Sequence, residues 1–189
     1  MDTLDGDQMQ LIPDPSEVSP RDTGIRYGVI MALATIIMNI LIYILGGHDP
    51  ANFGTALSLG CLSGIISIAI VVMGIKAHRD QDLGEFISLG RGLTVSFWMG
   101  LILGILSAIW NYVFVNFIAP ETLEAAQENI DRVRAQVEDG EAPEWALTLA
   151  EAGADAGNNP LNTIIASIII TIIIGFFASL FLKRDRPLG

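Results

Sequence analysis

Residues 161–182 read LNTIIASIIITIIIGFFASLFL, and this stretch contains no charged side chain. A helix needs about 20 consecutive apolar residues to cross the hydrocarbon core of a membrane. Three further stretches of the chain meet the same requirement. The four predicted spans are about 27–45, 54–75, 92–118 and 161–182. Buried core helices are the alternative, but the chain lacks the amphipathic helices that would have to cover four of them.

The composition also indicates a membrane protein. Of 189 residues, 51% are apolar and 16% are charged, and the mean hydropathy is +0.52. A soluble domain carries about 25% charged residues, so this shortage excludes a disordered chain and argues against an ordinary soluble globule. One cysteine (Cys61) and two histidines leave no disulfide framework and no thiolate metal site, and we expect neither metal nor cofactor. The predicted fold is all-α, a four-helix transmembrane bundle.

The charges divide the chain into an acidic N-terminal tail, residues 1–26, and a four-span membrane domain, residues 27–189. We expect the tail to be disordered. It lacks the basic start and the apolar run of a signal peptide, so the first span should be retained in the mature protein.

Lysine and arginine near the span ends predict the orientation, because these residues are enriched on the cytoplasmic side. Only Arg132 and Arg134 fall on one side of the predicted membrane. The basic residues on the other side are Arg21, Arg26, Lys76, Arg79, Arg91, Lys183, Arg184 and Arg186. The sequence therefore predicts a multi-pass protein of the cytoplasmic (inner) membrane, with both termini cytoplasmic and with residues 46–53 and 119–160 external.

Small residues recur every four positions in three of the spans. Because lipid tails are as apolar as leucine, spans associate through close contact of small residues. The residues expected at such contacts are Gly60, Gly64, Gly100, Gly104, Ser167, Thr171 and Gly175. We expect these ridges to hold a monomeric bundle together, although they could equally serve a homodimer.

Two connectors have patterns of their own. Between the second and third spans, apolar residues from Leu83 to Gly90 recur at helical spacing, which fits either a short interfacial helix or a polar turn. The loop over 119–160 predicts an external helical hairpin between spans 3 and 4, because an apolar helical stripe ends at Gly140 and a second begins near Trp145. We expect the hairpin to fold over the bundle. Its ten acidic residues against two arginines form either a solvated face or a surface for cations or a basic partner.

Polar side chains in the spans gather toward the external half. They are Asn39, Tyr43, Asn111, Tyr112, Asn116 and Asn162. They could line an outward-facing pocket for a lipid headgroup or another polar ligand, but interhelical hydrogen bonds are the commoner role of such residues. No ionisable residue lies in the central part of a span, which argues against a pump or a proton-coupled carrier.

Two short motifs resemble catalytic sequences. His78-Arg79-Asp80 spells a protein-kinase triplet, but that motif requires an asparagine where this chain has Glu85. The pair His48-Asp49 is typical of a tight turn; its alternative role is an acid–base pair. We expect no catalytic residue and no enzymatic activity.

Several motifs together resemble a known family. They are Tyr27 to Met31, Gly74 to Lys76 with Arg79-Asp80, Gly84 to Gly90, Ile109 to Phe114, and Phe117 to Glu121. They resemble the family called domain of unknown function 4199 (DUF4199), small four-span bacterial membrane proteins with a helical insert before the last span. The resemblance covers most of the chain after residue 25 and implies a bacterial inner-membrane protein. It transfers no catalytic or binding residue, and the acidic tail and the particular external loop fall outside it.

These features predict a non-enzymatic accessory or scaffold protein of the bacterial cytoplasmic membrane. Its expected partners are membrane lipid and either another membrane protein or a second copy of the chain, and no nucleic acid. The alternative is a small transporter or lipid-binding protein with an outward-facing polar pocket. A membrane enzyme would require His48 to meet an acidic residue of the external loop.

Overall fold

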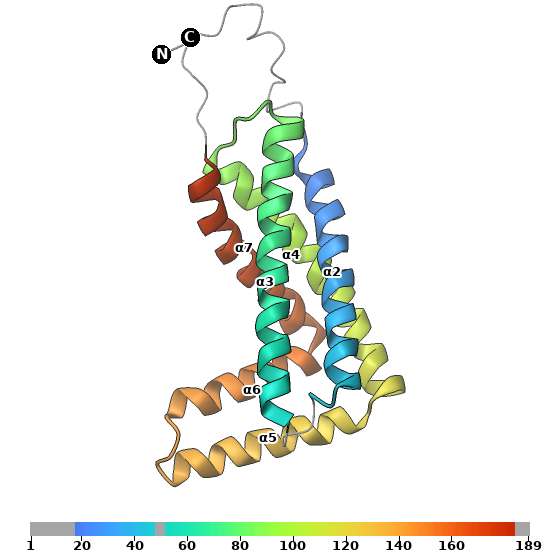
Figure 1. Cartoon of the computed structure of the whole chain (residues 1–189), viewed down its shortest axis with the longest axis vertical. Coiled ribbons are helices and arrows are strands. Elements are labelled where there is room, and N and C mark those ends of the chain that lie inside the picture. Colours follow the sequence, from blue (N-terminus) through green and yellow to red (C-terminus); the bar gives the residue numbers. More distant parts are fainter. Residues whose placement is uncertain (1–17, 48–51, 184–189) are drawn as a thin grey trace, which may run out of the picture.

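The computed structural model describes residues 18–47 and 52–183, and the part it describes is all-α (Figure 1). Four long helices run along the molecule, and each is long and apolar enough to cross a membrane. They are α2 (Pro20–Ile44), α3 (Phe53–Ala77), α4 (Leu89–Val113) and α7 (Pro160–Leu182). A hairpin between α4 and α7 consists of α5 (Glu121–Glu138) and α6 (Glu144–Asn158). The predicted four-helix bundle with a helical hairpin between spans 3 and 4 is confirmed.

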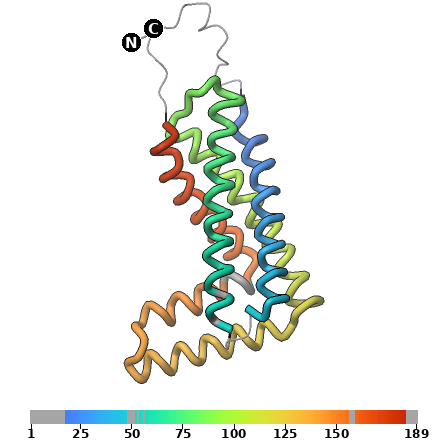
Figure 2. The backbone as a smooth tube through the Cα atoms, in the orientation of Figure 1, coloured from blue at the N-terminus to red at the C-terminus, as the bar shows by residue number. Residues whose placement is uncertain are grey.

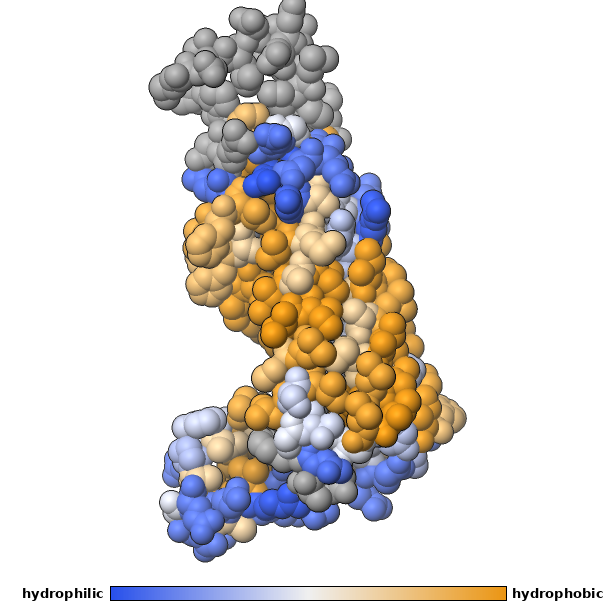
Figure 3. Space-filling view, in the orientation of Figure 1, coloured by the Kyte–Doolittle hydropathy of each residue, from blue (hydrophilic) through white to orange (hydrophobic). Residues whose placement is uncertain are grey.

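The two ends of the bundle differ. The hairpin end carries α5 and α6, and the terminal end, opposite, is where α2 begins and α7 ends (Figure 1). Between the ends, the surface of the long helices is a belt of apolar residues, whereas hydrophilic residues gather at both ends (Figure 3). A belt of this kind is the surface that a bilayer covers.

Capping residues fix where the spans begin. The Ser19 side chain accepts a hydrogen bond from the backbone N of Arg21 (3.2 Å), and Pro20 opens α2. Asn159 caps α7 in the same way, immediately before Pro160. Residues 20–26 are therefore helical, which corrects the predicted tail boundary at residue 26. The remainder of that tail, up to residue 17, lies outside the described residues.

α4 and α7 approach each other through glycine. A Cβ atom placed on Gly104 would lie 2.7 Å from Ile164 Cα, and one placed on Gly100 would lie 2.8 Å from Ile168 Cα. No residue larger than glycine allows these two backbones to come so close, as expected for helices that associate within a membrane. The residues of α7 expected at helix contacts lie along the same seam: Ser167, Thr171 and Gly175.

α2 packs on another side of α4. A Cβ atom on Gly28 would lie 3.0 Å from the carbonyl oxygen of Met99, a close approach that the sequence analysis did not single out. Around Met99, buried side chains from α2, α3 and α4 form the main apolar core, which includes Met31, Ile75 and Val95. This core lies in the terminal half of the bundle.

Among its described side chains, α3 is most deeply buried in its terminal half. Val71 and Ile75 are fully buried, whereas Cβ atoms on Gly60 and Gly64 would meet nothing within 4 Å in the described part of the chain. The structure therefore corrects the expectation that these two glycines pack inside the bundle. The hairpin-side half of α3 stands open on one face.

The connector at the terminal end contains a π-helical turn, η2 (His78–Asp82), directly after α3. The chain then turns toward α4 with positive φ angles at Gly84 (60°) and Glu85 (73°). Such backbone angles interrupt a helix, and they are uncommon for a residue with a side chain. The alternative of a short interfacial helix in this connector is therefore wrong, and the turn alternative is correct.

α5 and α6 lie across the hairpin end and project past one side of the bundle (Figure 2). Gly140, with a φ of 74°, makes the turn between them. Ile130 is buried, and an ion pair between Arg134 and Glu151 (3.1 Å) joins the two helices. The expectation that the hairpin folds over the bundle is corrected in part: the hairpin crosses the end of the bundle, but much of its length projects past one side of it (Figure 2).

Candidate functional site

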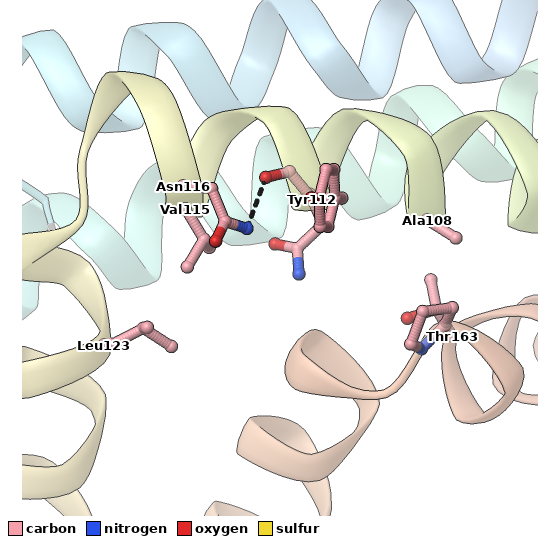
Figure 4. Close-up of a pocket in the computed structure, with 8 residues that line it drawn as sticks. Ala108, Tyr112, Val115, Asn116, Leu123 and Thr163 are labelled. Atoms are coloured by element: carbon pink, nitrogen blue, oxygen red, sulfur yellow. Dashed lines mark hydrogen bonds between the residues drawn. The ribbon is translucent and has the colours of Figure 1, made fainter.

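A cavity of about 390 Å³ lies at the hairpin end between α4, α5 and α7 (Figure 4). Small-molecule sites in proteins range from roughly 300 to 1,000 Å³, so the space suits a small ligand or one end of a larger one. The polar lining residues are Asn111, Tyr112, Asn116 and Thr163. Val115 and Leu123 contribute apolar wall.

The end of α4 shapes this cavity. After Val113 the helix widens into a π-helical turn, η3 (Phe114–Ile118), which closes where the Ala119 amide donates to the Phe114 carbonyl (2.8 Å). π-helical turns inside α-helices are rare and occur frequently at functional sites. Within this segment the Asn116 amide donates to the Tyr112 carbonyl (2.8 Å), which holds the Asn116 side chain at the cavity wall (Figure 4).

The cavity chemistry suits an uncharged polar group attached to an apolar one. Asn111 and Asn116 carry carboxamides, which both donate and accept hydrogen bonds. None of the lining residues is charged. A hydroxyl, amide or ester group could therefore bind the two asparagines while its hydrocarbon part contacts Val115 and Leu123.

Two of the predicted pocket residues lie elsewhere, on α2. The indole N–H of Trp110 donates to the Asn39 side-chain oxygen (3.0 Å), and the Tyr43 hydroxyl donates to Glu121 (2.8 Å). The Tyr43 ring also packs edge-on against Phe114, with ring centroids 5.4 Å apart. Asn39 and Tyr43 thus join α2 to the end of α4 and the start of α5.

Asn162 lies next to the cavity but does not line it. Its amide donates to the Asp155 carboxylate (2.5 Å), which links α7 to α6. Of the six residues predicted to form a pocket, the structure brings together Asn111, Tyr112 and Asn116. It places the other three in contacts between helices.

A second polar cluster, at the terminal end, was missed by the sequence analysis. His78 is fully buried, and its Nδ1 lies 2.8 Å from the Asp82 carboxylate. The Thr23 hydroxyl donates to the same carboxylate oxygen (2.8 Å), and Arg91 Nε donates to His78 Nε2 (3.3 Å). Because Nε2 accepts this bond, the network assigns the ring proton to Nδ1, which donates to Asp82, and the imidazole is neutral.

This cluster, which we call the terminal clamp (Thr23, His78, Asp82 and Arg91), connects α2, η2 and α4. Arg91 also donates to the backbone carbonyl of Val18. Buried polar groups require hydrogen-bond partners, and the clamp satisfies them by joining three segments of the chain. A fully buried ring gives a substrate no access, so the arrangement suits a structural role. The signal that could have found it is the i, i+4 spacing of His78 and Asp82.

The described residues offer no site for a metal ion. Within residues 18–47 and 52–183, no group of three or more His, Cys, Asp or Glu side chains could hold a metal ion. The pair His48-Asp49 lies outside the described residues.

Comparisons with known proteins give one match. A family model described as protein of unknown function (DUF4199) matches residues 26–184. No curated protein matches the chain, and no solved structure matches it. The matched range contains the cavity, α3 and the hairpin, so these belong to the part of the chain that the family model covers.

Proposed function

This chain belongs to the DUF4199 family of proteins of unknown function, and on that premise we propose that it is a non-enzymatic accessory or scaffold protein of the bacterial cytoplasmic membrane. The observation that carries the proposal is a surface on the hairpin-side half of α3 that no other described part of the chain covers. We call this surface the open α3 face, and it consists of Leu57, Gly60, Cys61, Gly64 and Ile68.

The open α3 face has the features of a helix-contact surface. Gly60 and Gly64 are four residues apart, the spacing at which small residues let two membrane helices approach closely. The same chain uses Gly100 and Gly104 in this way to bring α7 against α4. A Cβ atom placed on Gly60 or Gly64 would meet nothing within 4 Å in the part of the chain that the structure describes, so this face can accept a helix from a second copy or from another membrane protein.

The basic residues support the orientation that we propose. Arg21, Lys76 and Arg91 belong to segments at the terminal end, whereas the hairpin carries ten acidic residues and two arginines. Lysine and arginine favour the cytoplasmic side. This distribution therefore supports an orientation in which the terminal end and both termini are cytoplasmic and the hairpin is external. The scaffold would then present α5 and α6 at the external side of the membrane and the open α3 face within it.

Cys61 allows a direct test, because it is the single cysteine of the chain, is exposed, and lies on the open α3 face. A benzophenone maleimide attached to Cys61 in native membranes, then illuminated, should give a discrete protein adduct. Gly60→Leu with Gly64→Leu should abolish that adduct by filling the face. Ala69→Leu is the matched control, because Ala69 is exposed on the same helix but turned away from Gly60 and Gly64.

Mass spectrometry of the adduct identifies the partner as a second copy or another protein. Adducts with lipid alone in the wild-type protein contradict the scaffold proposal. Equal loss of the adduct in Ala69→Leu also contradicts it, since the effect would then not depend on the open α3 face.

A second candidate function is favoured by the cavity: a small transporter or lipid-binding protein that holds a polar headgroup at Asn111 and Asn116. Native mass spectrometry of protein extracted with its surrounding lipid should then show one reproducible bound molecule. Asn111→Leu should remove it, and Asn162→Leu should retain it, because Asn162 lies outside the cavity lining. Bulk lipid alone in all three proteins rejects this candidate.

A further inference from the structure

α6 carries an apolar stripe that faces no other part of the described chain. Trp145, Thr148, Leu149 and Ala152 follow one another at helical i, i+3, i+4, i+7 spacing, and all four are exposed. Trp145 is 67% exposed and Leu149 is 66% exposed. A tryptophan and a leucine so fully exposed on one helix stripe indicate a contact that the chain alone does not make.

The stripe lies on the side of α6 that points away from α5. At 3.6 residues per turn, the half-buried Ala146, Leu147 and Ala150 form the face opposite Trp145 and Leu149. α6 begins at the far end of the hairpin, where α5 lies beside it (Figure 1), and the Arg134–Glu151 ion pair ties the edge of that face to α5. The apolar stripe is thus directed away from α5.

That direction is toward the level of the membrane. α6 lies between α5 and the level of the long helices, and the hairpin runs across the axes of those helices (Figure 1). The molecule is hollowed between the projecting hairpin and the apolar belt (Figure 3). Since lipid must cover the belt, the surface of the same leaflet fills the hollow above α6.

We propose that the hairpin is a membrane-surface arm: α6 lies in the headgroup region of the leaflet at the hairpin end, with Trp145 and Leu149 inserted among the lipids and α5 toward water. Tryptophan is enriched at this depth, because its ring is apolar and its N–H remains hydrated or hydrogen-bonded. The arm extends the lateral footprint of the bundle and sets the height of the cavity relative to the lipid headgroups.

Charge decides which lipid interaction drives the contact. The hairpin segment carries ten acidic residues and two arginines, and the charges of α6 (Glu144, Glu151 and Asp155) lie beside the stripe rather than on it. Anionic headgroups would repel this helix, unlike the basic helices that bind them. The arm therefore binds zwitterionic lipid through apolar contact, and added salt does not release it.

The test measures depth at single positions of the full chain. In a Cys61→Ser background, Leu149→Cys places a spin label on the stripe, and Ala135→Cys places one on the exposed side of α5 opposite Ile130. Each protein is reconstituted as single copies in phosphatidylcholine nanodiscs. Collision rates with oxygen, which partitions into lipid, are compared with those of a water-soluble nickel complex.

We expect the oxygen-to-nickel ratio at residue 149 to exceed that at residue 135 severalfold, and to be unchanged by added potassium chloride. In a third protein, Thr148→Cys carries the label and Trp145→Glu with Leu149→Glu removes the apolar stripe. The ratio at residue 148 should then fall to the value at residue 135, while circular dichroism shows that the helix content is retained.

Equal ratios at residues 149 and 135 overturn the proposal. They mean that the stripe stays in water even when lipid is offered. A lipid contact that appears only with anionic headgroups, or that salt removes, also overturns it. Neither result changes the outcome of the Cys61 experiment. Cys61 lies on α3, within a membrane span, whereas the stripe lies on α6, in the hairpin.

Discussion

Replacing Gly104 with alanine adds one methyl group where α4 and α7 are closest. The new Cβ atom would lie 2.7 Å from Ile164 Cα and 3.2 Å from the Ile164 carbonyl oxygen. Carbon atoms in favourable contact are about 3.5–4.0 Å apart, so α7 has to retreat by about 1 Å. A change of rotamer cannot relieve the overlap, because both atoms belong to the backbone.

Gly60→Ala is the matched comparison, because there the same methyl group meets nothing within 4 Å among the described residues. Both substitutions gain the same helix propensity, about 1 kcal/mol for alanine over glycine, so this gain cancels in the difference between them. What remains is the overlap at Gly104. Overpacking of this kind costs about 1–3 kcal/mol, and we expect Gly104→Ala to be less stable than Gly60→Ala by that amount.

The assay is an equilibrium titration with sodium dodecyl sulfate in mixed micelles, followed by circular dichroism. The protein is kept dilute, so that association through the open α3 face does not contribute to stability. Equal free energies of unfolding for the two variants would refute the close approach of α4 and α7. A lower value for Gly60→Ala would refute the assignment of the open α3 face.

Three further outcomes test other parts of the structure. Arg91→Ala removes donors from the terminal clamp and should cost about 1–3 kcal/mol of stability, seen as a lower thermal midpoint; an unchanged midpoint means that the clamp is not formed. Trp110→Phe removes one interhelical hydrogen bond and should cost about 0.6 kcal/mol in the detergent titration, whereas a loss as large as that of Arg91→Ala would give Trp110 a role beyond joining helices. Gly140→Cys with Cys61→Ser should react with an impermeant maleimide on intact cells, and reaction only after permeabilisation would reverse the proposed orientation.

The spans and the hairpin could be predicted because their signals are local. A helix that crosses a membrane excludes charge, so the fourth span was placed to within one residue of α7. The hairpin helices were visible from their apolar stripes and from the break at Gly140. The direction of the hairpin could not be predicted, because it depends on how η3 and the residues after it turn the chain. Nothing in the residue pattern of this segment indicates a π-helical turn.

The grouping of polar residues could not be predicted from periodicity, which places a side chain on a face of its own helix but does not identify the neighbouring helix. Trp110 and Asn111 are adjacent in sequence, yet Trp110 bonds to Asn39 while Asn111 lines the cavity. The predicted cluster therefore divides between two sides of α4. His78 was missed for a related reason: its polar partners Thr23 and Arg91 lie on α2 and α4, which the periodicity of its own segment does not identify.

The central claim is that the open α3 face accepts a second helix, and the photo-adduct at Cys61 in native membranes tests it most directly. The account predicts one discrete protein adduct that survives Ala69→Leu and disappears when Gly60 and Gly64 are replaced by leucine. Lipid adducts alone, in a wild-type protein that is folded and inserted, would contradict it.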